Sequence, residues 1–228
     1  MTMQNDLKAL AKNGILRVAI NTGNRALVQM KGDNFTGVSP ALAQRLVEEI
    51  GAKMEPVVYS GAGKIFADAE HDVWDVGFLA IDPMRAEKIA FTQPYIVIEA
   101  TYAVRAGSDF RDVENIDQKG VHVLTSTGSA YDMHLSKSLQ NATLEHSGTP
   151  PDSFSEFAEG RCDVVAGVRA SLEGYFANNE DVRILSGVLT SVRQAMVLPD
   201  CTDPRIKALD DFVARAIADG FVDAAKGG

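Results

Sequence analysis

The sequence predicts an α/β fold with two lobes, in which each lobe is a mainly parallel sheet flanked by helices. Strand-like and helix-like stretches alternate along all 228 residues, an order typical of parallel sheets covered by helices. The alternation starts again near Arg105, which indicates a second lobe, and a late strand-like stretch at Ala195–Leu198 returns to the first. The chain therefore crosses twice between the lobes, and a double-crossover hinge of this kind can close on a ligand.

The elements of the first lobe follow from apolar periodicity and from residues that start and stop helices. Asn13-Gly14 stops the first helix. We expect Ser39 to cap the next helix, with Pro40 in its first turn and Gly51 at its end. In chain order the expected elements are a helix over Asp6–Lys12, a strand over Ile15–Ile20, a helix from Ser39 to Ile50, a strand over Met54–Tyr59, a helix over Gly63–Glu70 and a strand over Val76–Ala80.

The second lobe shows the same alternation, interrupted by a break at Pro150-Pro151. We place the crossings near Tyr102–Arg105 and Arg193–Val197, so that residues 1–104 and 196–228 form lobe 1 and residues 105–195 form lobe 2. The remaining expected elements are a strand over Val121–Leu124, a helix opening at Gly128, a strand over Thr143–Glu145, a helix over Phe154–Gly160, a strand over Cys162–Val168, the strand at Ala195–Leu198 and an amphipathic helix over Ile206–Phe221.

The composition excludes several classes of function. A content of 46% hydrophobic and 23% charged residues is that of an ordinary globular protein. The net charge of −9 argues against nucleic-acid binding, because a surface that follows phosphates needs an excess of Lys and Arg. It does not exclude an anionic small molecule, since a few cations in a cleft can outweigh a distant acidic surface.

Cysteines, histidines and the first residues of the chain add further limits. Cys162 and Cys201 form no C-x-x-C motif; a disulfide is possible, but we expect two free, buried thiols. The four histidines lack zinc-ligand spacing, so we expect no metal and no other cofactor. Residues 1–13 show no export signal, and no stretch has transmembrane length. The protein is therefore expected in the periplasm if a leader has been removed, and in the cytoplasm otherwise.

The stretch from Trp74 to Tyr95 is the most informative part of the chain. A buried strand ends abruptly at the polar turn Asp82-Pro83, and Arg85 follows directly. Open α/β sheets bind ligands beyond the carboxyl ends of their strands. The planar guanidinium of Arg85 is suited to holding a carboxylate through two hydrogen bonds. The alternative is that Arg85 only caps a helix or faces solvent.

Four segments in this order resemble the family-3, amino-acid-type, extracellular solute-binding proteins, which have the type-2 periplasmic-binding-protein fold. In chain order they are the opening strand Gly14–Ile20, the segment Phe35–Ala43, the stretch Trp74–Tyr95 that carries Arg85, and Gly160–Ala166 in the second lobe. The resemblance covers nearly the whole chain. It implies a two-lobed binding protein of an ABC-type importer, which captures a small solute in the cleft between its lobes by hinge closure, without catalysis and as a monomer.

The resemblance also implies which residues bind the ligand. In amino-acid-binding members an Arg matching Arg85 and amides matching Gly128-Ser129-Ala130 hold the α-carboxylate, at a helix start whose dipole favours an anion. Ser129 could instead be only an N-cap. The strand end at Leu79 and Ala80 belongs to the site but lacks the usual serines. The turn after the opening strand contributes Asn21 and Asn24, whose amides could bind either polarity.

Further departures from the family concern the charge of the ligand. Val168 and Arg169 stand where amino-acid binders carry an acidic residue for the α-ammonium. Lys64 follows a glycine-rich loop where many relatives place an aromatic residue. A cleft with Arg85, Lys64 and Arg169 and no acidic partner would favour an anionic carboxylate. The alternative places Lys64 and Arg169 on the surface, in water.

Two other functions stay open. Some relatives of this family, the cyclohexadienyl dehydratases, resemble binding proteins adapted to eliminate water from a ring carboxylate. That chemistry needs a positioned general acid, for which Glu173 and Asp82 are the candidates near the cleft. The third possibility is a cytoplasmic ligand sensor or carrier, which the missing export signal favours.

Overall fold

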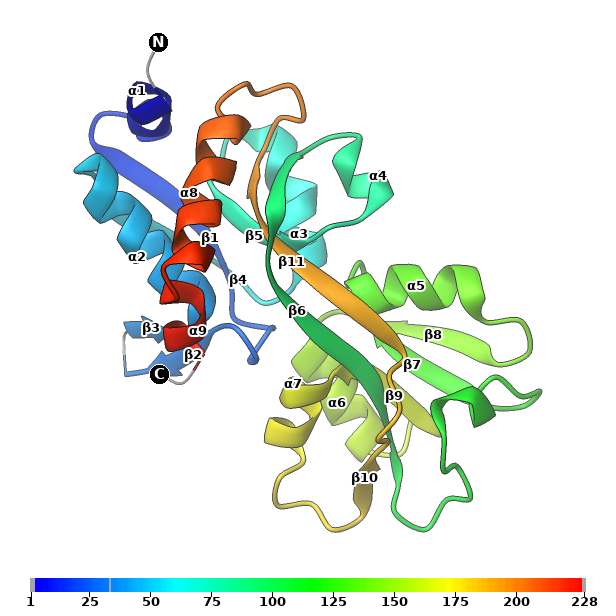
Figure 1. Ribbon diagram of the computed structural model, residues 1–228. Helices are drawn as coiled ribbons and strands as arrows, with labels where there is room; N and C mark the ends of the chain where they lie inside the picture. The colour runs from blue at the N-terminus through cyan, green and yellow to red at the C-terminus, as the bar shows by residue number, and fades with distance from the viewer. Residues whose placement is uncertain (1–2, 33, 227–228) are drawn as a thin grey trace. The chain divides into compact units, whose positions relative to one another are not determined.

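The computed structural model describes residues 3–32 and 34–226 and has the predicted α/β architecture (Figure 1). Its contacts divide the chain into two units: unit 1 comprises Met1–Thr22, Leu27–Val97 and Arg193–Gly228, and unit 2 comprises Gly23–Ala26 and Ile98–Val192. Two long strands, β6 (Ala90–Arg105) and β11 (Thr190–Leu198), contribute residues to both units. The predicted domain division, at 104–105 and 195–196, falls on these same strands and stays a prediction.

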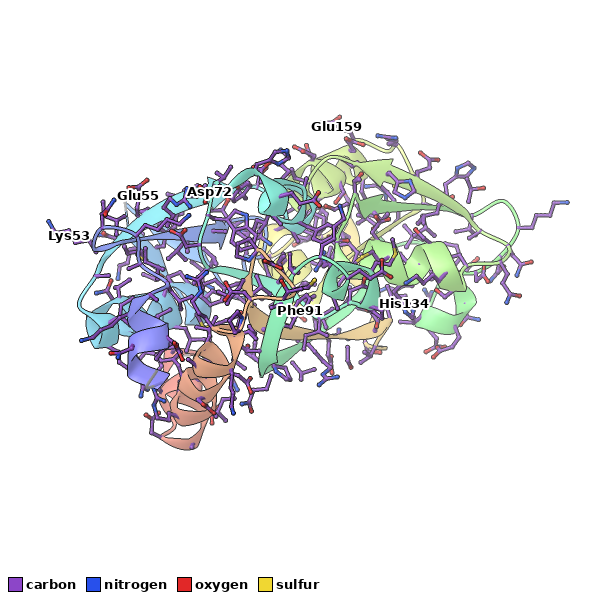
Figure 2. All side chains as sticks on the ribbon, turned by 90° about the horizontal axis from the view of Figure 1, so that it is seen from above. Lys53, Glu55, Asp72, Phe91, His134 and Glu159 are labelled. Atoms are coloured by element: carbon purple, nitrogen blue, oxygen red, sulfur yellow. The ribbon has the colours of Figure 1, made fainter. Side chains whose placement is uncertain are left out.

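The sheet of unit 1 has the predicted parallel arrangement. Strand β1 (Ile15–Asn21) pairs in parallel with β4 (Lys53–Tyr59), in a register that joins Ile15 to Lys53 and Asn21 to Tyr59. A parallel bridge joins Val18 to Val76, directly before β5 (Gly77–Ala80), which pairs antiparallel with β11. Lys53 and Glu55 project from β4 into solvent (Figure 2).

Helix α2 (Val38–Ile50) begins one residue earlier than the sequence predicts. Its N-cap is Gly37, with φ of +103°, and a Cβ there would lie 2.5 Å from the Leu27 carbonyl oxygen. Ser39 is therefore not the cap: its hydroxyl lies 2.9 Å from the Tyr95 hydroxyl inside the core. The predicted end is confirmed, because Gly51 adopts a left-handed conformation and donates to the carbonyls of the last turn.

The remaining elements of unit 1 cover its sheet and close its core. Helix α8 (Ile206–Ala218) packs beside α1 (Met3–Lys8) and α9 (Phe221–Ala225), and α9 also contacts α2 (Figure 1). The other elements are β2 (Gln29–Lys31), β3 (Asn34–Thr36), α3 (Ala62–Ala67), the 3-10 helix η1 (Asp68–His71) and α4 (Pro83–Ala86). The core against β5 is built around Trp74 and the apolar side chains of neighbouring strands and helices.

Unit 2 is built on three parallel strands. Strand β7 (His122–Ser126) lies between β8 (Thr143–Ser147) and β9 (Val164–Val168), and the unit-2 part of β6 pairs antiparallel with β9 and β10 (Val182–Ile184). Helices α5 (Ala130–Ser138), α6 (Pro150–Ala158) and α7 (Arg169–Tyr175) and the 3-10 helix η2 (Val113–Asn115) complete the unit.

The predicted break at Pro150-Pro151 is wrong. Both prolines lie in the first turn of α6, where no amide donor is required, and Thr149 caps the helix by accepting from the Asp152 amide. Phe154 and Phe157 of this helix pack with Leu124 and Val165 in the core of unit 2. None of the described helices is both long and apolar enough to cross a membrane.

Candidate functional site

In unit 1 the candidate site is centred on Arg85, directly after β5. All four residues of β5 are buried, and Asp82 caps the short helix α4 by accepting from the amides of Met84 (2.9 Å) and Arg85 (3.3 Å). The Arg85 side chain turns back toward the strand end: Nη1 donates to the Ala80 carbonyl oxygen at 2.9 Å. Leu79 and Ala80 are themselves buried. The guanidinium is thus positioned by the carboxyl end of β5.

Burial governs the electrostatics of Arg85, which is only 1% exposed to solvent. Loss of hydration lowers the pKa of Arg85 to about 10, and the nearby Asp82 carboxylate opposes this shift. The side chain therefore still carries its charge at neutral pH. A charged guanidinium in a poorly hydrated position binds anions more strongly than one in bulk water, because the local dielectric constant is lower. This arrangement can hold a carboxylate.

The other predicted residues of unit 1 lie on separate elements. Asn21 ends β1 and is half-buried. Lys64, in the first turn of α3, is exposed, and its Nζ donates to the Ser60 hydroxyl at 3.0 Å. This contact ties Lys64 to the loop that precedes its own helix. The exposure agrees with the alternative that Lys64 lies in water.

In unit 2 the candidate site is the start of α5. Ser129 is the N-cap, and its hydroxyl accepts from the Asp132 amide at 3.1 Å. The Gly128 amide donates to Oδ2 of Asp132 at 2.8 Å, and the Ser129 amide donates to the Ser126 carbonyl at 3.1 Å. Within residues 3–32 and 34–226, the amides of Ala130 and Tyr131 donate no hydrogen bond. These two donors and the helix dipole favour an anion at this point.

Two predicted residues of unit 2 have contacts that bear on their roles. Asn24 lies in the segment that groups with unit 2, and its Oδ1 is buried without a hydrogen-bond partner among the residues that the structure describes. Arg169 opens α7 and donates four hydrogen bonds, one to Glu99 and three to carbonyl oxygens between Leu185 and Gly187. These contacts use four of the five N–H groups of a guanidinium, a structural role.

The end of β9 is apolar, as the sequence indicates. Val168 is buried and pairs with Ala100 of β6. The two candidates for a general acid lie on different helices. Asp82 is the N-cap of α4, and Glu173 is an exposed residue of α7. In the described part of the chain, no three His, Cys, Asp or Glu residues are grouped so that they could hold a metal ion.

Both cysteines are free thiols. Cys162 is buried, and burial raises the pKa of its thiol to about 11. Cys201, in the loop before α8, is exposed, so the expectation of two buried thiols is wrong for this residue. Its Sγ lies 3.3 Å from the Glu87 carbonyl oxygen. Neither position shows the activating surroundings of a catalytic cysteine.

Sequence patterns did not predict one pair of residues that the fold brings together. Asp132 is buried at the start of α5, and Nε2 of His146 on β8 lies 3.0 Å from its Oδ1. The spacing Ser129-x-x-Asp132 is close to a capping box, which could have marked Asp132 as part of the helix start. No sequence signal relates His146 to it, because β8 and α5 meet only in the folded unit.

Comparisons with known proteins agree with the α/β fold. The family model of the bacterial extracellular solute-binding proteins, family 3, matches residues 16–226. A comparison with curated sequences gives no match. Similar solved structures include an amino acid ABC transporter substrate-binding protein from Streptococcus pneumoniae bound to L-arginine, with 16% identity, 97% of this chain and 96% of that chain covered, and a TM-score of 0.83.

Two further structures share the fold at similarly low identity. The GluR0 ligand-binding core in complex with L-glutamate is 17% identical, with 93% and 96% of the chains covered and a TM-score of 0.78. The ancestral amino acid-binding protein AncCDT-1, a precursor of cyclohexadienyl dehydratase, is 22% identical, with 96% of each chain covered and a TM-score of 0.80. At these identities the structures show the fold alone. Because the family model matches nearly the whole length, this chain belongs to the bacterial extracellular solute-binding proteins of family 3.

Proposed function

We propose that this protein binds a small carboxylate-bearing solute and delivers it to an ABC-type importer. Arg85 in unit 1 and the first turn of α5 in unit 2 are the two carboxylate-binding elements. The observation that carries the proposal is the position of Arg85: a buried, charged guanidinium at the carboxyl end of β5, in a chain of this family. Closure of the hinge on the ligand stays a prediction.

The start of α5 supports the same ligand group. The amides of Ala130 and Tyr131 and the hydroxyl of Ser129 are hydrogen-bond donors at the positive end of a nine-residue helix. A carboxylate bound there would accept from neutral donors and would need no cation. The L-arginine and L-glutamate in the two similar structures differ in side-chain charge but share an α-carboxylate, which agrees with this part of the proposal.

We further propose that the solute is anionic overall. Val168 stands where amino-acid binders carry an acidic partner for the α-ammonium, and Glu99, on the paired strand β6, is already bonded to Arg169. A ligand cation would therefore lose hydration without gaining an anionic partner at this position. Dicarboxylates and acidic amino acids are the solutes that fit best.

The partner and the cellular location follow from the same proposal. A binding protein of this family passes its solute to a membrane permease, which requires the exported protein to work in the periplasm or outside the cell. We propose that the protein acts as a monomer and without catalysis. Fractionation of the native cells separates this proposal from a cytoplasmic sensor, and recovery of unchanged solute from the complex separates it from an enzyme.

Calorimetric titration of the purified protein with succinate, L-glutamate, L-arginine and putrescine tests the proposal. The expected order of affinity places succinate or L-glutamate first. Arg85→Lys keeps the charge but loses the bidentate geometry, and we expect it to weaken binding by at least about 2 kcal/mol, roughly 30-fold. Arg45→Lys is the matched control, because Arg45 pairs with Asp219 on the surface of the same unit.

Two results would contradict the proposal in different ways. Tightest binding of L-arginine or putrescine would show that the anionic class is wrong while leaving Arg85 as a carboxylate ligand. Equal affinity of Arg85→Lys and wild type for every solute would remove Arg85 from the site. The melting temperature of each variant, measured without ligand, shows whether a loss of affinity reflects a loss of folded protein.

A further inference from the structure

A buried carboxylate lies at the same helix start that the proposed function assigns to an anionic ligand. Oδ2 of Asp132 accepts from the Gly128 amide at 2.8 Å, while the Asp132 amide donates to the Ser129 hydroxyl at 3.1 Å. The carboxylate therefore fixes the loop that carries the ligand-binding donors. Its negative charge also lies within the first turn of α5 and weakens the attraction of that turn for a second anion.

The second oxygen of this carboxylate faces a histidine. Oδ1 of Asp132 is buried and accepts no hydrogen bond from the described residues, and Nε2 of His146 lies 3.0 Å from it. The His146 side chain is 47% exposed, so solvent reaches its imidazole. The end of β8 is tied to the same loop, because the amide and hydroxyl of Thr127 both donate to the Ser147 carbonyl.

Other charged groups on the neighbouring elements have partners of their own. On β8 and β7, Glu145 binds His122 at 2.6 Å. On α6, Asp152 accepts from the Thr149 hydroxyl, and Glu156 pairs with Arg161, whose Nη2 also lies 3.5 Å from the His146 carbonyl oxygen. Two more titratable or charged residues of α5 are His134 and Lys137. Among the ion pairs of the described residues, Asp132 is the carboxylate that contacts the His146 imidazole.

We propose that Asp132 and His146 make anion binding at the start of α5 proton-linked, with Asp132 as the positioning residue and His146 as the proton acceptor. This inference rests on the proposed function, because the ligand anion must bind at the α5 donors. A proton on His146 neutralises the charge of Asp132 without disturbing its bond to Gly128. Loss of that proton restores a net negative charge beside the ligand.

The direction of the effect follows from these charges. Both carboxylates of L-glutamate stay ionised between pH 5.5 and 8, whereas an imidazole titrates within this range. The anion should therefore bind more tightly at pH 5.5 than at pH 8. For charges separated by one helical turn near a protein surface, we expect a change in Kd of about fivefold.

Titrations with L-glutamate, whose carboxylates are ionised at both pH values, at pH 5.5 and pH 8 test the proposal against matched variants. His146→Gln should remove the pH dependence. His122→Gln is the control, because His122 is 49% exposed and also bonded to a carboxylate, yet it does not contact Asp132. Asp132→Asn keeps an oxygen acceptor for Gly128 but has no charge, so it should bind L-glutamate more tightly than wild type at pH 8 and show no pH dependence. A purely structural role would predict weaker binding.

A ligand-free measurement separates this inference from the proposed function. In NMR spectra of the unliganded protein, the Gly128 amide should shift across the imidazole titration range in wild type and His122→Gln, but not in His146→Gln. If that shift is present and no carboxylate binds at any pH, the proposed function fails and the ligand part of this inference fails with it. The inference itself is overturned if the chemical shift of the Gly128 amide does not change with pH in wild type. It is also overturned if Kd still depends on pH in His146→Gln.

Discussion

Arg17 and Asp75 are joined by three hydrogen bonds across the start of the unit-1 sheet. The Arg17 amide and Nε both donate to Oδ2 of Asp75, at 2.9 and 3.0 Å, and Nη2 donates to Oδ1 at 2.7 Å. Asp75 is buried, and it directly precedes Val76, which bridges to β1. The Arg17–Asp75 pair therefore fixes the segment around Val76 beside β1, and with it β5, the strand that leads to Arg85.

We expect Asp75→Asn to lower the free energy of unfolding by about 2 kcal/mol, because Arg17 loses the buried one of its two carboxylate partners. Burial alone would raise the pKa of Asp75, but the Arg17 hydrogen bonds outweigh it and the pKa is lowered. The stabilisation is thus complete above the ordinary value of 3.8 and is lost as the pH falls below it. Urea denaturation between pH 2.5 and 7 measures this loss.

Asp72 provides the comparison for that experiment. Asp72 also pairs with Arg17, and hydrogen bonds from Lys12 and Arg17 lower the pKa of Asp72 to about 2. Its side chain, however, projects into solvent (Figure 2). Water and salt screen such a contact. Asp72→Asn should therefore change stability far less than Asp75→Asn. An equal effect of the two substitutions would contradict the importance of burial at Asp75.

Gly167→Ala should destabilise unit 2 by about 1–3 kcal/mol, because the core is overpacked. A Cβ at this position of β9 would lie 2.8 Å from Cζ of Phe154, whose ring is buried between α6 and the sheet. Gly107→Ala is the control, since a Cβ there meets nothing within 4 Å. Thermal unfolding of the two variants should show a lower melting temperature for Gly167→Ala alone.

Ser129→Ala should cost about 1 kcal/mol of stability, as expected for loss of an N-cap, and should also weaken ligand binding. Thr149→Ala removes the corresponding cap of α6 and should cost a similar amount of stability with unchanged affinity. Thermal unfolding and calorimetric titration on both variants separate the two roles of Ser129. Equal affinities would leave Ser129 as an N-cap only.

Arg169→Ala should lower the free energy of unfolding by about 2 kcal/mol, because three carbonyl oxygens between Leu185 and Gly187 lose a charged donor. The geometry predicts little change in ligand affinity. The sequence-based prediction is the opposite: Arg169 contacts the ligand, and Arg169→Asp shifts preference toward ammonium ligands. Measuring unfolding and affinity on both variants decides between these two roles.

A thiol reagent should modify one cysteine of the native protein rapidly. Cys201 is exposed, whereas Cys162 is buried and its thiol pKa is raised to about 11, so very little thiolate forms at neutral pH. Mass spectrometry after brief labelling at pH 7.5 should find the label on Cys201. Labelling of Cys162 at a similar rate would indicate that the core of unit 2 opens easily.

Local patterns predicted most of the elements near the site. The strand into Ala80, the turn at Asp82-Pro83 and the helix start at Ser129 are determined by side chains that act on their own backbone. The same local reasoning failed at Ser39 and Pro150. At Ser39 a hydrogen bond with the distant Tyr95 competes with capping, and at Pro150 two prolines suit a first helical turn as well as a break.

The amino-acid sequence by itself determined the α/β class, the family and the residue, Arg85, on which the proposed function depends. These features follow from periodicity and short motifs, which involve neighbours along the chain. The tertiary structure decided how each charge is used. It bonds Arg169 to carbonyl oxygens 16 to 18 positions away, buries Arg85 against Ala80, and brings His146 within 3.0 Å of Asp132. Such contacts depend on which elements pack together, and a linear pattern contains no information on the distance between side chains of different elements.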